Sequence, residues 1–450
     1  MLNQLAAGLR GGLLTPGSAV YERKRRGWNA AIDQRPRVIV ECADAGDVRH
    51  AVRLAAAQGA GVAVRGGGHS IAGHGSADHS VLLDLSRFKK ILITPDEQAV
   101  VAGGGVTWGE MVAATAPHRL AAPGGFNPDV GIGGLTLGGG YGALTRLHGL
   151  ACDNLIAVEL VNAQGELVTV DEQHDPDLFW ALRGAGANFG VVLSLRFKLH
   201  SIPALYAGHV AHSLRRCRDL LHLHRDFTAG LSDATTAYFG IRHQRRGPAY
   251  VFIAALHAGP AHEAERIFAP LRRYATPAID DFAPCSYTAI HQANIGAFPT
   301  GLGNYWRAHF LRRLSDAALD VIAEHALRVQ DTDFYAVIEH LGGAMARVAP
   351  SATAFAHRDA AFGIAITARW RLEEDPAAAI RQVQAMHQDL IPEASGGVYV
   401  NYVGADATLA TVRAAYGANY GRLLALKRRH DPANLFRHNV NIDPLQSGSP

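Results

Sequence analysis

The stretch Arg65-Gly66-Gly67-Gly68-His69-Ser70 follows directly on a short apolar run, residues 61–64. Three consecutive glycines at the end of a strand let the backbone approach a flat or anionic group closely. They also leave amide N–H groups free to face phosphate oxygens. In an ordinary loop His69 would only satisfy a nearby carbonyl group, but behind these glycines it is placed to bond whatever they contact. His74 and His79 lack such neighbours, and we interpret them as polar loop residues.

A second glycine-rich stretch, Gly-Ile-Gly-Gly-Leu-Thr-Leu-Gly-Gly-Gly-Tyr-Gly, occupies residues 131–142. It does not match a dinucleotide-binding fingerprint, because it does not link a strand to a helix within a βαβ unit and has no acidic residue at the expected distance. We predict instead an extended wall of backbone, nearly free of side chains, along a long cofactor; the alternative is a purely structural loop. The two glycine-rich stretches together predict a large phosphate-bearing cofactor and redox chemistry.

Composition narrows the class of protein. A chain of 450 residues with 48% hydrophobic residues predicts at least two domains. The net charge of +3 is spread along the chain without a basic stripe, which argues against nucleic-acid binding. No apolar run approaches the roughly 18 residues of a membrane span. Four widely spaced cysteines and scattered histidines lack metal-ligand spacing, so we expect no metal site, free thiols and a cytoplasmic location.

The periodicity of apolar residues predicts an α+β protein with a boundary near Ile202-Pro203. Before the boundary, helices and strands mix. After it, five candidate strands are separated by helices, which is typical of an antiparallel sheet covered by helices on one face. The predicted strands are 38–40, 61–65, 81–85, 155–161, 167–170, 191–199, 236–242, 250–256, 305–311, 334–340, 362–369 and 398–403; the predicted helices are 44–58, 107–116, one beginning at 175, 261–274, 316–329, 376–390 and 409–428.

Residues 36–199 resemble the FAD-binding domain of flavoproteins of the vanillyl-alcohol-oxidase (VAO) type, and the C-terminal segment resembles that of berberine-bridge-enzyme-like proteins. The stretches that carry the resemblance are 65–70, 134–142, 149–154 and 188–192 in the first region, and 399–402, 416–420, 426–427 and 431–436 in the second. The resemblance implies a two-domain flavoprotein: a VAO/PCMH-type FAD-binding domain (30–203), a substrate-binding domain (204–397) and a C-terminal segment (398–445) that completes the FAD domain.

The resemblance further implies that His69 carries FAD through the flavin 8α-methyl carbon, as in bacterial members with one covalent link. Some relatives form a second link through a cysteine that precedes a Pro-x-Val-Gly stretch. Asn127 holds that position here, so we expect a single link, and we interpret Cys152 as a packing thiol near the cofactor. The predicted cofactor-binding residues are Arg65, Gly66, Gly67, Gly68, His69, Ser70, Gly73, Pro123, Gly124, Gly125, Asn127, Gly131, Gly134, Leu135, Gly138, Gly139, Gly140, Tyr141, Gly142, Cys152, Asp153, Asn154, Gly190, Val191, Tyr399 and Asn401.

The candidate catalytic residues are tyrosines and neighbouring polar residues. On the predicted strand 398–403, Tyr399 and Asn401 share one face and Tyr402 occupies the other. The resemblance places this strand across flavin and substrate, where a phenol could accept a proton if its pKa is lowered; Tyr141 could do the same from the opposite wall. The alternative is ordinary aromatic packing. Only one of the adjacent residues Glu339 and His340 can face the pocket, and either could be a general base.

These features predict an FAD-dependent oxidase. It would remove a hydride and a proton from a C–OH or C–NH centre of a small molecule or secondary metabolite, and O2 would reoxidise the flavin to give H2O2. Two alternatives remain open, a flavin dehydrogenase that uses another acceptor and a flavin-binding protein without turnover. The sequence does not indicate the substrate or the oligomeric state.

Overall fold

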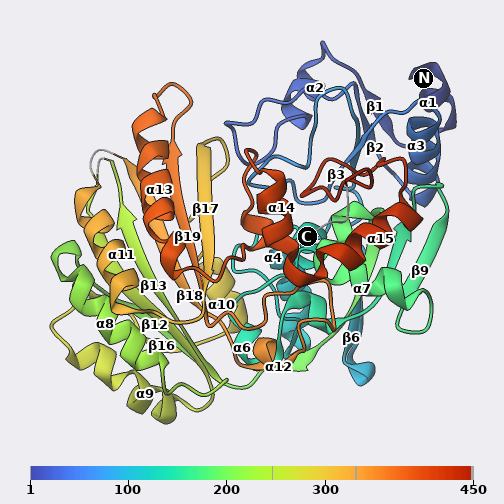
Figure 1. The fold of residues 1–450 in the computed structure, drawn as a ribbon. Helices are drawn as coiled ribbons and strands as arrows, with labels where there is room; N and C mark the ends of the chain where they lie inside the picture. Colours follow the sequence, from blue (N-terminus) through green and yellow to red (C-terminus); the bar gives the residue numbers. More distant parts are fainter. Residues whose placement is uncertain (1, 246, 330–331, 447–450) are drawn as a thin grey trace.

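The computed structural model describes residues 2–245, 247–329 and 332–446. Figure 1 shows two halves, one of which carries both termini. That half contains two sheets, and the other contains a single large sheet with helices on its outer face. Within the described ranges, no helix is both long and apolar enough to cross a membrane.

The first sheet contains the strand that leads into the glycine-histidine stretch. Its order is β1-β2-β4-β3, from β1 (Gly12–Leu14), β2 (Val38–Glu41), β3 (Val62–Arg65) and β4 (Val81–Asp84). β2, β4 and β3 run parallel and β1 antiparallel. Helix α3 (Ala45–Ala57) covers this sheet and begins at Asp44, whose side chain accepts a hydrogen bond from the Asp47 amide. Two short helices, α1 (Leu2–Gly8) and α2 (Ala19–Lys24), precede the sheet.

The second sheet is antiparallel and packs beside the first. Its order is β5-β6-β10-β8-β9, from β5 (Ile91–Thr94), β6 (Ala99–Gly103), β10 (Val191–Lys198), β8 (Leu155–Val161) and β9 (Leu167–Asp171). A capping box at Thr107 opens α4 (Trp108–Thr115), and Asp175 caps α7 (Pro176–Ala185). A small ladder joins β7 (Leu120–Ala121) to β11 (His200–Ser201). Short helices in this half are η1 (Pro95–Glu97), η2 (Ala116–His118), α6 (Thr145–His148), η3 (Ala151–Asn154) and η4 (Gly186–Asn188).

The other half contains the antiparallel sheet that the periodicity predicted. Its order is β15-β12-β14-β13-β18-β19-β17, with β16 also pairing with β12. The strands are β12 (Leu205–Ser213), β13 (Thr235–His243), β14 (Tyr250–Ala258), β15 (Ile279–Asp280), β16 (Ala283–Cys285), β17 (Gly303–Leu311), β18 (Asp333–His340) and β19 (Phe362–Trp370). Helices α8 (Cys217–Thr228), α9 (Ala261–Arg273), α11 (Asp316–Arg328) and α13 (Ala377–Asp389) cover one face (Figure 1). The remaining short helices are η5 (Leu214–Arg216), α10 (Tyr287–Gln292), α12 (Ala344–Arg347) and η6 (Ile391–Glu393).

The C-terminal segment differs from the prediction in two places. The expected strand 398–403 is wrong, because Val400–Tyr402 forms the 3-10 turn η7. The expected long helix is two helices, α14 (Leu409–Tyr416) and α15 (Tyr420–His430), separated by η8 (Gly417–Asn419). Gly417 has a φ of +52°, which ends the first helix. The segment then returns to the first sheet, where the Val62 amide donates to the Leu435 carbonyl at 3.0 Å.

The second glycine-rich stretch is not an extended wall. Ile132–Leu137 forms helix α5, with Gly131 at its N-cap and Ile132 and Leu137 in the core. Gly139 and Gly140, which follow, have φ values of +113° and +80°. The sequence did not predict this helix, because some of its positions are glycine, which is a poor helix former. Core packing of the apolar side chains stabilises it.

Candidate active site

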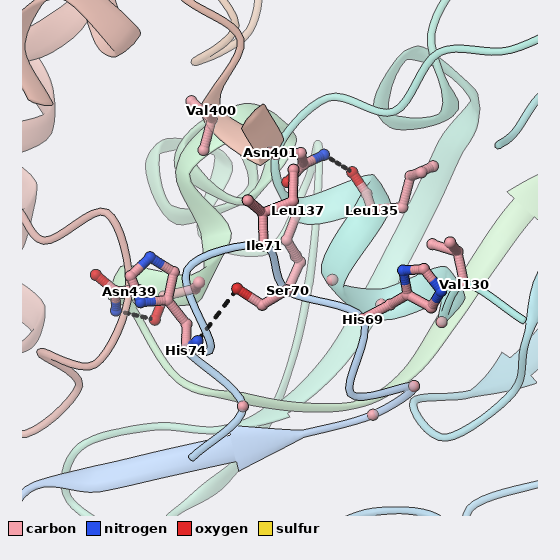
Figure 2. A pocket seen from close by; sticks show the side chains of 18 of the residues that line it. His69, Ser70, Ile71, His74, Val130, Leu135, Leu137, Val400, Asn401 and Asn439 are labelled. Atoms are coloured by element: carbon pink, nitrogen blue, oxygen red, sulfur yellow. Dashed lines mark hydrogen bonds between the residues drawn. The ribbon is translucent and has the colours of Figure 1, made fainter. Parts of the chain in front are cut away.

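One cavity is lined by residues of both halves and contains about 1960 Å³ of space free of atoms, counting the part that is open to solvent. Both glycine-rich stretches, the C-terminal segment and the sheet of the second half contribute to its wall. Figure 2 shows one part of it, with His69 beside Val130 and His74 beside Asn439. The predicted residues that line the cavity are Arg65, Gly66, Gly67, Gly68, His69, Ser70, Gly125, Asn127, Gly131, Gly134, Leu135, Gly138, Tyr141, Gly190, Tyr399 and Asn401.

The two glycine-rich stretches meet backbone to backbone at Gly67 and Gly131. A Cβ atom added to Gly67 would lie 2.4 Å from the Gly131 nitrogen, so no larger residue fits there. Gly134 is different. A Cβ atom added to it would meet no protein atom within 4 Å, although this glycine lines the cavity. The space beside Gly134 therefore suits a ligand that approaches the backbone closely.

His69 lies on the cavity wall with its ring stacked on that of Trp28. The ring centroids are 4.5 Å apart and the planes differ by 17°. Burial lowers the pKa of His69 to about 4, so its imidazole is neutral at physiological pH. Its Nε2 atom is buried and has no hydrogen-bond partner among the described residues. A neutral ring with a buried, unpartnered nitrogen is suited to bonding a cofactor.

Further polar atoms of the cavity wall are buried without partners. His74 Nε2, His438 Nε2 and Asn439 Oδ1 have no hydrogen-bond partner within the described part of the chain. Burial lowers the pKa of His74 and that of His438 to about 4. Such atoms are rare in folded proteins unless a ligand or water satisfies them. An open space beside Gly134, glycine amides and unpartnered polar atoms together fit a long cofactor with polar groups along its length, as FAD has.

Arg65 lines the cavity but is already paired. Its Nη2 donates to Asp84 Oδ2 at 3.1 Å, and its Nη1 donates to the Lys24 carbonyl. The guanidinium group therefore ties the glycine loop to β4 and α2. Its contribution to the cavity is to hold this loop in place.

Glu339 connects two tyrosines of the cavity wall. The Tyr141 hydroxyl donates to Oε2 of Glu339 at 2.5 Å, and the Tyr402 hydroxyl donates to Oε1 at 2.8 Å. Glu339 is 4% exposed, and burial raises its pKa to about 7 although both hydrogen bonds oppose this rise. The carboxyl does not itself line the cavity, but both phenols do. It can thus exchange protons with the cavity through either phenol.

The cavity brings Tyr399, Asn401 and Tyr402 together. The Tyr399 hydroxyl accepts hydrogen bonds from the Gly140 amide at 3.1 Å and from Asn401 Nδ2 at 2.7 Å. Asn401 Nδ2 also donates to the Leu135 carbonyl at 3.0 Å, as Figure 2 shows. The predicted separation of Tyr402 from the other two on opposite strand faces is wrong, because the 3-10 turn directs all three toward the cavity.

None of the three tyrosines has the lowered pKa that a role as proton acceptor would require. Burial raises the pKa of Tyr141, Tyr399 and Tyr402, and Glu339 raises all three further by its charge. A phenol in this site therefore stays neutral and can only relay a proton. Glu339 is the group whose pKa suits a base.

His340 faces away from the cavity, as the alternation of β18 requires once Glu339 faces it. Its ring stacks on Phe362 with centroids 5.5 Å apart, and burial, together with the positive charge of Arg146, lowers its pKa to about 3. His340 does not line the cavity. The structure therefore selects Glu339 from the two alternatives.

Several predicted cofactor contacts stand behind the cavity wall. Cys152 is fully buried, burial raises the pKa of its thiol, and its neighbour Asp153 pairs with Arg358. Asn154 donates to the carbonyls of His148 and Leu150. These side chains hold the core together and do not reach the cavity. The predicted residues that do not line it are Gly73, Pro123, Gly124, Gly139, Gly140, Gly142, Cys152, Asp153, Asn154 and Val191.

Other wall residues were missed by the sequence analysis. Trp28, Phe298 and Trp306 come from segments with no glycine-rich neighbours, so no local pattern marked them. His74 was interpreted as a polar loop residue, whereas it lines the cavity. Tyr402 was assigned to the wrong face. No cluster of side chains that could hold a metal ion occurs in the described part of the chain.

Comparison with known proteins agrees with this geometry. Residues 36–171 match the model of the FAD binding domain, and residues 398–443 match the model described as berberine and berberine like. The chain is 32% identical to (R)-6-hydroxynicotine oxidase of Paenarthrobacter nicotinovorans, covering 97% of each protein. It is 26% identical to chitooligosaccharide oxidase of Gibberella zeae, covering 95% of this chain and 91% of the relative.

Solved structures give the same result. The crystal structure of 6-hydroxy-D-nicotine oxidase from Arthrobacter nicotinovorans superposes with a TM-score of 0.89 at 31% identity, covering 97% of this chain and 98% of that one. A berberine-bridge-enzyme-like protein of Physcomitrella patens superposes with a TM-score of 0.90 at 24% identity over 99% of each chain, which concerns the fold alone. The predicted fold class is confirmed, and FAD is the cofactor that the cavity suits. The chain belongs to the VAO-type, berberine-bridge-enzyme-like family of FAD-linked oxidoreductases.

Proposed function

We propose that this enzyme is an oxidase that removes a hydride and a proton from a C–OH or C–NH centre of a small organic molecule and delivers the electrons to O2, forming H2O2. The observation that carries the proposal is the buried Glu339 carboxyl, bonded to two phenols of the cavity wall. The names of the relatives support it, since they include oxidases of 6-hydroxynicotine and of chitooligosaccharide. FAD, when bound, supplies the acceptor for the hydride and the reaction with O2.

Glu339 would serve as the final proton acceptor. A substrate hydroxyl or amine in the cavity reaches the oxygen of Tyr141 or Tyr402, and that tyrosine passes its own proton to the Glu339 carboxylate. A base with a pKa near 7 is half ionised at neutral pH, which favours proton transfer in both directions. Because each phenol accepts one proton as it passes on another, neither has to remain ionised. The raised pKa values of both phenols are therefore compatible with this relay.

Tyr399 and Asn401 would shape the site. The Tyr399 hydroxyl already accepts two hydrogen bonds, so it can donate its hydrogen to a substrate or cofactor atom. The ring of Tyr399 lies 4.3 Å from that of Tyr141, which keeps both side chains in place. These contacts orient the bound molecule and exclude water from the proton relay.

His69 would hold FAD covalently through the flavin 8α-methyl carbon. The unpartnered Nε2 and the neutral state of the ring support this attachment. Asn127 lines the cavity at the position where some relatives place a second linking cysteine. A single link is therefore part of the proposal.

The attachment is tested by the intact mass of the denatured protein. We expect an increase corresponding to one attached FAD in the wild type and in Cys152→Ala, and its loss in His69→Ala. Retention of the increase in His69→Ala would place the link elsewhere.

The activity is tested by screening alcohols and amines for loss of flavin absorbance without oxygen, followed by peroxide measurement in air. Rapid peroxide formation supports an oxidase. Flavin reduction followed by slow peroxide formation and rapid transfer to an artificial acceptor would support a dehydrogenase instead. If dithionite reduces the flavin but none of the alcohols and amines does, the result would support a flavin-binding protein without turnover.

A further inference from the structure

Trp28 makes three contacts that join the flavin-attachment loop to the opposite half of the molecule. Its backbone N–H donates to the Gly68 carbonyl at 3.0 Å, directly before His69. Its ring stacks on the His69 ring. Its indole Nε1 donates to the Phe298 carbonyl at 2.9 Å. Trp28 is 4% exposed and lies outside the segment 36–171 that matches the FAD binding domain.

We propose that Trp28 is a positioning residue for the covalent attachment of FAD: it holds the His69 imidazole in one plane, with an edge toward the cavity, and keeps water from one face of the ring. The proposal rests on the attachment through His69 proposed above. Trp28 would orient the His69 ring before FAD binds.

Few other restraints act on the His69 ring. Gly66, Gly67 and Gly68, which precede it, have no side chains that could hold it. Its Nε2 has no partner among the described residues, and the hydrogen bond that favours its charged form comes from its own backbone. Reactive histidines are usually oriented by a second hydrogen-bonded group. Here the stacked indole takes the place of such a group.

The position of Trp28 is itself well fixed. The Trp306 ring packs against it edge-on, with centroids 6.5 Å apart. Ile71 and Ala365 complete the same apolar cluster. The indole is therefore held by contacts from both halves before any cofactor binds, and the His69 ring is oriented in advance.

Atoms and electrons are conserved in the attachment step. A bond forms between a ring nitrogen of His69 and the 8α carbon of FAD, and one C–H bond of that methyl group and the N–H bond of the imidazole break. The methyl carbon is oxidised, and the flavin takes up the two electrons with both protons. O2 then reoxidises the flavin and is reduced to H2O2. Trp28 takes no part in the bond changes; it acts only on the placement and solvation of His69.

The experiment uses full-length apoprotein from riboflavin-starved cells, to which FAD is added. Acid-stable flavin fluorescence of the chain then measures the rate of covalent attachment, and quenching of free FAD fluorescence measures non-covalent binding. The variants are Trp28→Leu, which removes the stacked ring, and Trp28→Phe, which keeps a ring but loses the indole N–H. Trp180→Leu is the matched control, since Trp180 is also 4% exposed and its indole Nε1 also donates to a backbone carbonyl, that of Ser351, at 2.8 Å, but it does not line the cavity.

We expect attachment, measured at saturating FAD, to slow by roughly 3- to 10-fold in Trp28→Leu, the size expected for loss of one aromatic pair. Trp28→Phe should restore the rate to within about twofold of the wild type. Trp180→Leu should attach FAD at the wild-type rate. Equal rates in the wild type and Trp28→Leu, or equal slowing in Trp28→Leu and Trp180→Leu, would overturn the proposal.

A pH profile separates positioning from a general loss of structure. Without the indole, water reaches His69 and its pKa rises toward the ordinary value, with the charge of Asp129 acting in the same direction in every variant. Attachment in Trp28→Leu should therefore decline below about pH 6.5 while the wild type stays constant to about pH 5. Identical profiles would contradict the shielding role. If the wild type carries no acid-stable flavin, the proposed attachment through His69 is itself wrong. That result differs from equal attachment in all variants, which would contradict only the role of Trp28.

Discussion

The Tyr402 hydroxyl donates a hydrogen bond to Oε1 of Glu339 at 2.8 Å, although 63 positions separate the two residues. Tyr402 belongs to the C-terminal segment that returns to the FAD-binding half, and Glu339 to a strand of the other half. The hydrogen bonds of the proposed proton relay therefore form only where the two halves meet. Its other member, Tyr141, comes from the end of the second glycine-rich stretch.

Replacing the base should remove most of the chemistry and leave binding intact. Glu339→Gln keeps the size of the side chain but cannot accept a proton, and we expect the rate of flavin reduction to fall roughly 100- to 10,000-fold with little change in substrate affinity. Stopped-flow absorbance under anaerobic conditions measures both. The control is Glu324→Gln on an exposed face of α11, which should have no effect. A fall of less than fivefold would exclude Glu339 as the base.

The pH dependence of the same step follows from the raised pKa of Glu339. Its carboxyl is protonated below about pH 7 and cannot then accept a proton, so the rate of flavin reduction should rise with pH through about 7 and level off above it. Glu339→Gln should lack this inflection. If the variant keeps the wild-type profile, the group that titrates is another one.

Substitutions of Gly134 separate an effect on FAD binding from an effect on the stability of the fold. Because a Cβ atom there meets no protein atom and the residue lies in helix α5, Gly134→Ala should leave the apoprotein as stable or raise its free energy of unfolding by about 0.4–1 kcal/mol. FAD binding should weaken, and more strongly in Gly134→Leu. Thermal unfolding of the apoprotein and FAD titration measure the two effects.

Gly230 is the matched control, since a Cβ atom there also meets nothing within 4 Å but the residue does not line the cofactor cavity. Gly230→Ala should leave FAD binding unchanged. Normal FAD binding by Gly134→Leu would show that the cofactor does not approach this glycine.

Asp153 and Arg358 form a buried pair that should matter for stability rather than for FAD contact. The guanidinium donates to both carboxylate oxygens at 2.7 Å, and Arg358 is 1% exposed. Arg358→Met leaves the carboxylate buried without its cationic partner and should lower the free energy of unfolding by about 3–5 kcal/mol. Denaturant unfolding provides the measurement.

The exposed pair Arg312–Asp359, also 2.7 Å apart, is the comparison. Arg312→Met should lower the free energy of unfolding by less than about 1 kcal/mol. Equal losses in the two variants would contradict the role assigned to burial.

The buried His224 should lower the free energy of unfolding at acidic pH. It is fully buried between the rings of Phe239 and Phe362, and burial lowers its pKa to about 3. The unfolded chain takes up a proton near pH 6.5, so this stability is complete above pH 6.5 and declines as the pH falls toward 3, by about 2 kcal/mol at pH 5. His224→Phe should therefore lose less thermal stability between pH 7.5 and pH 5 than the wild type. The exposed His262→Gln variant should behave like the wild type, and an unchanged loss in His224→Phe would refute the assignment.

Much of the architecture could be predicted locally. The start of α4 at Thr107, the glycine-histidine loop after β3 and the alternating strands of the second half are set by neighbouring residues, because strand and helix periodicity and glycine conformations are short-range properties. The failures were also local in origin. The helix α5 contains glycines that disfavour it, and the turn η7 has a strand-like composition, so tertiary packing decided both.

By itself, the sequence predicted that a large phosphate-bearing cofactor meets the backbone near His69, since closely spaced glycines permit such an approach. It could not choose between Glu339 and His340, because strand alternation says that they face opposite ways but not which way is inward. Packing of the two halves made that choice by placing Tyr141 and Tyr402 against one of them. Tertiary contacts within the FAD-binding half brought Trp28 onto His69, a contact between segments that share no local pattern.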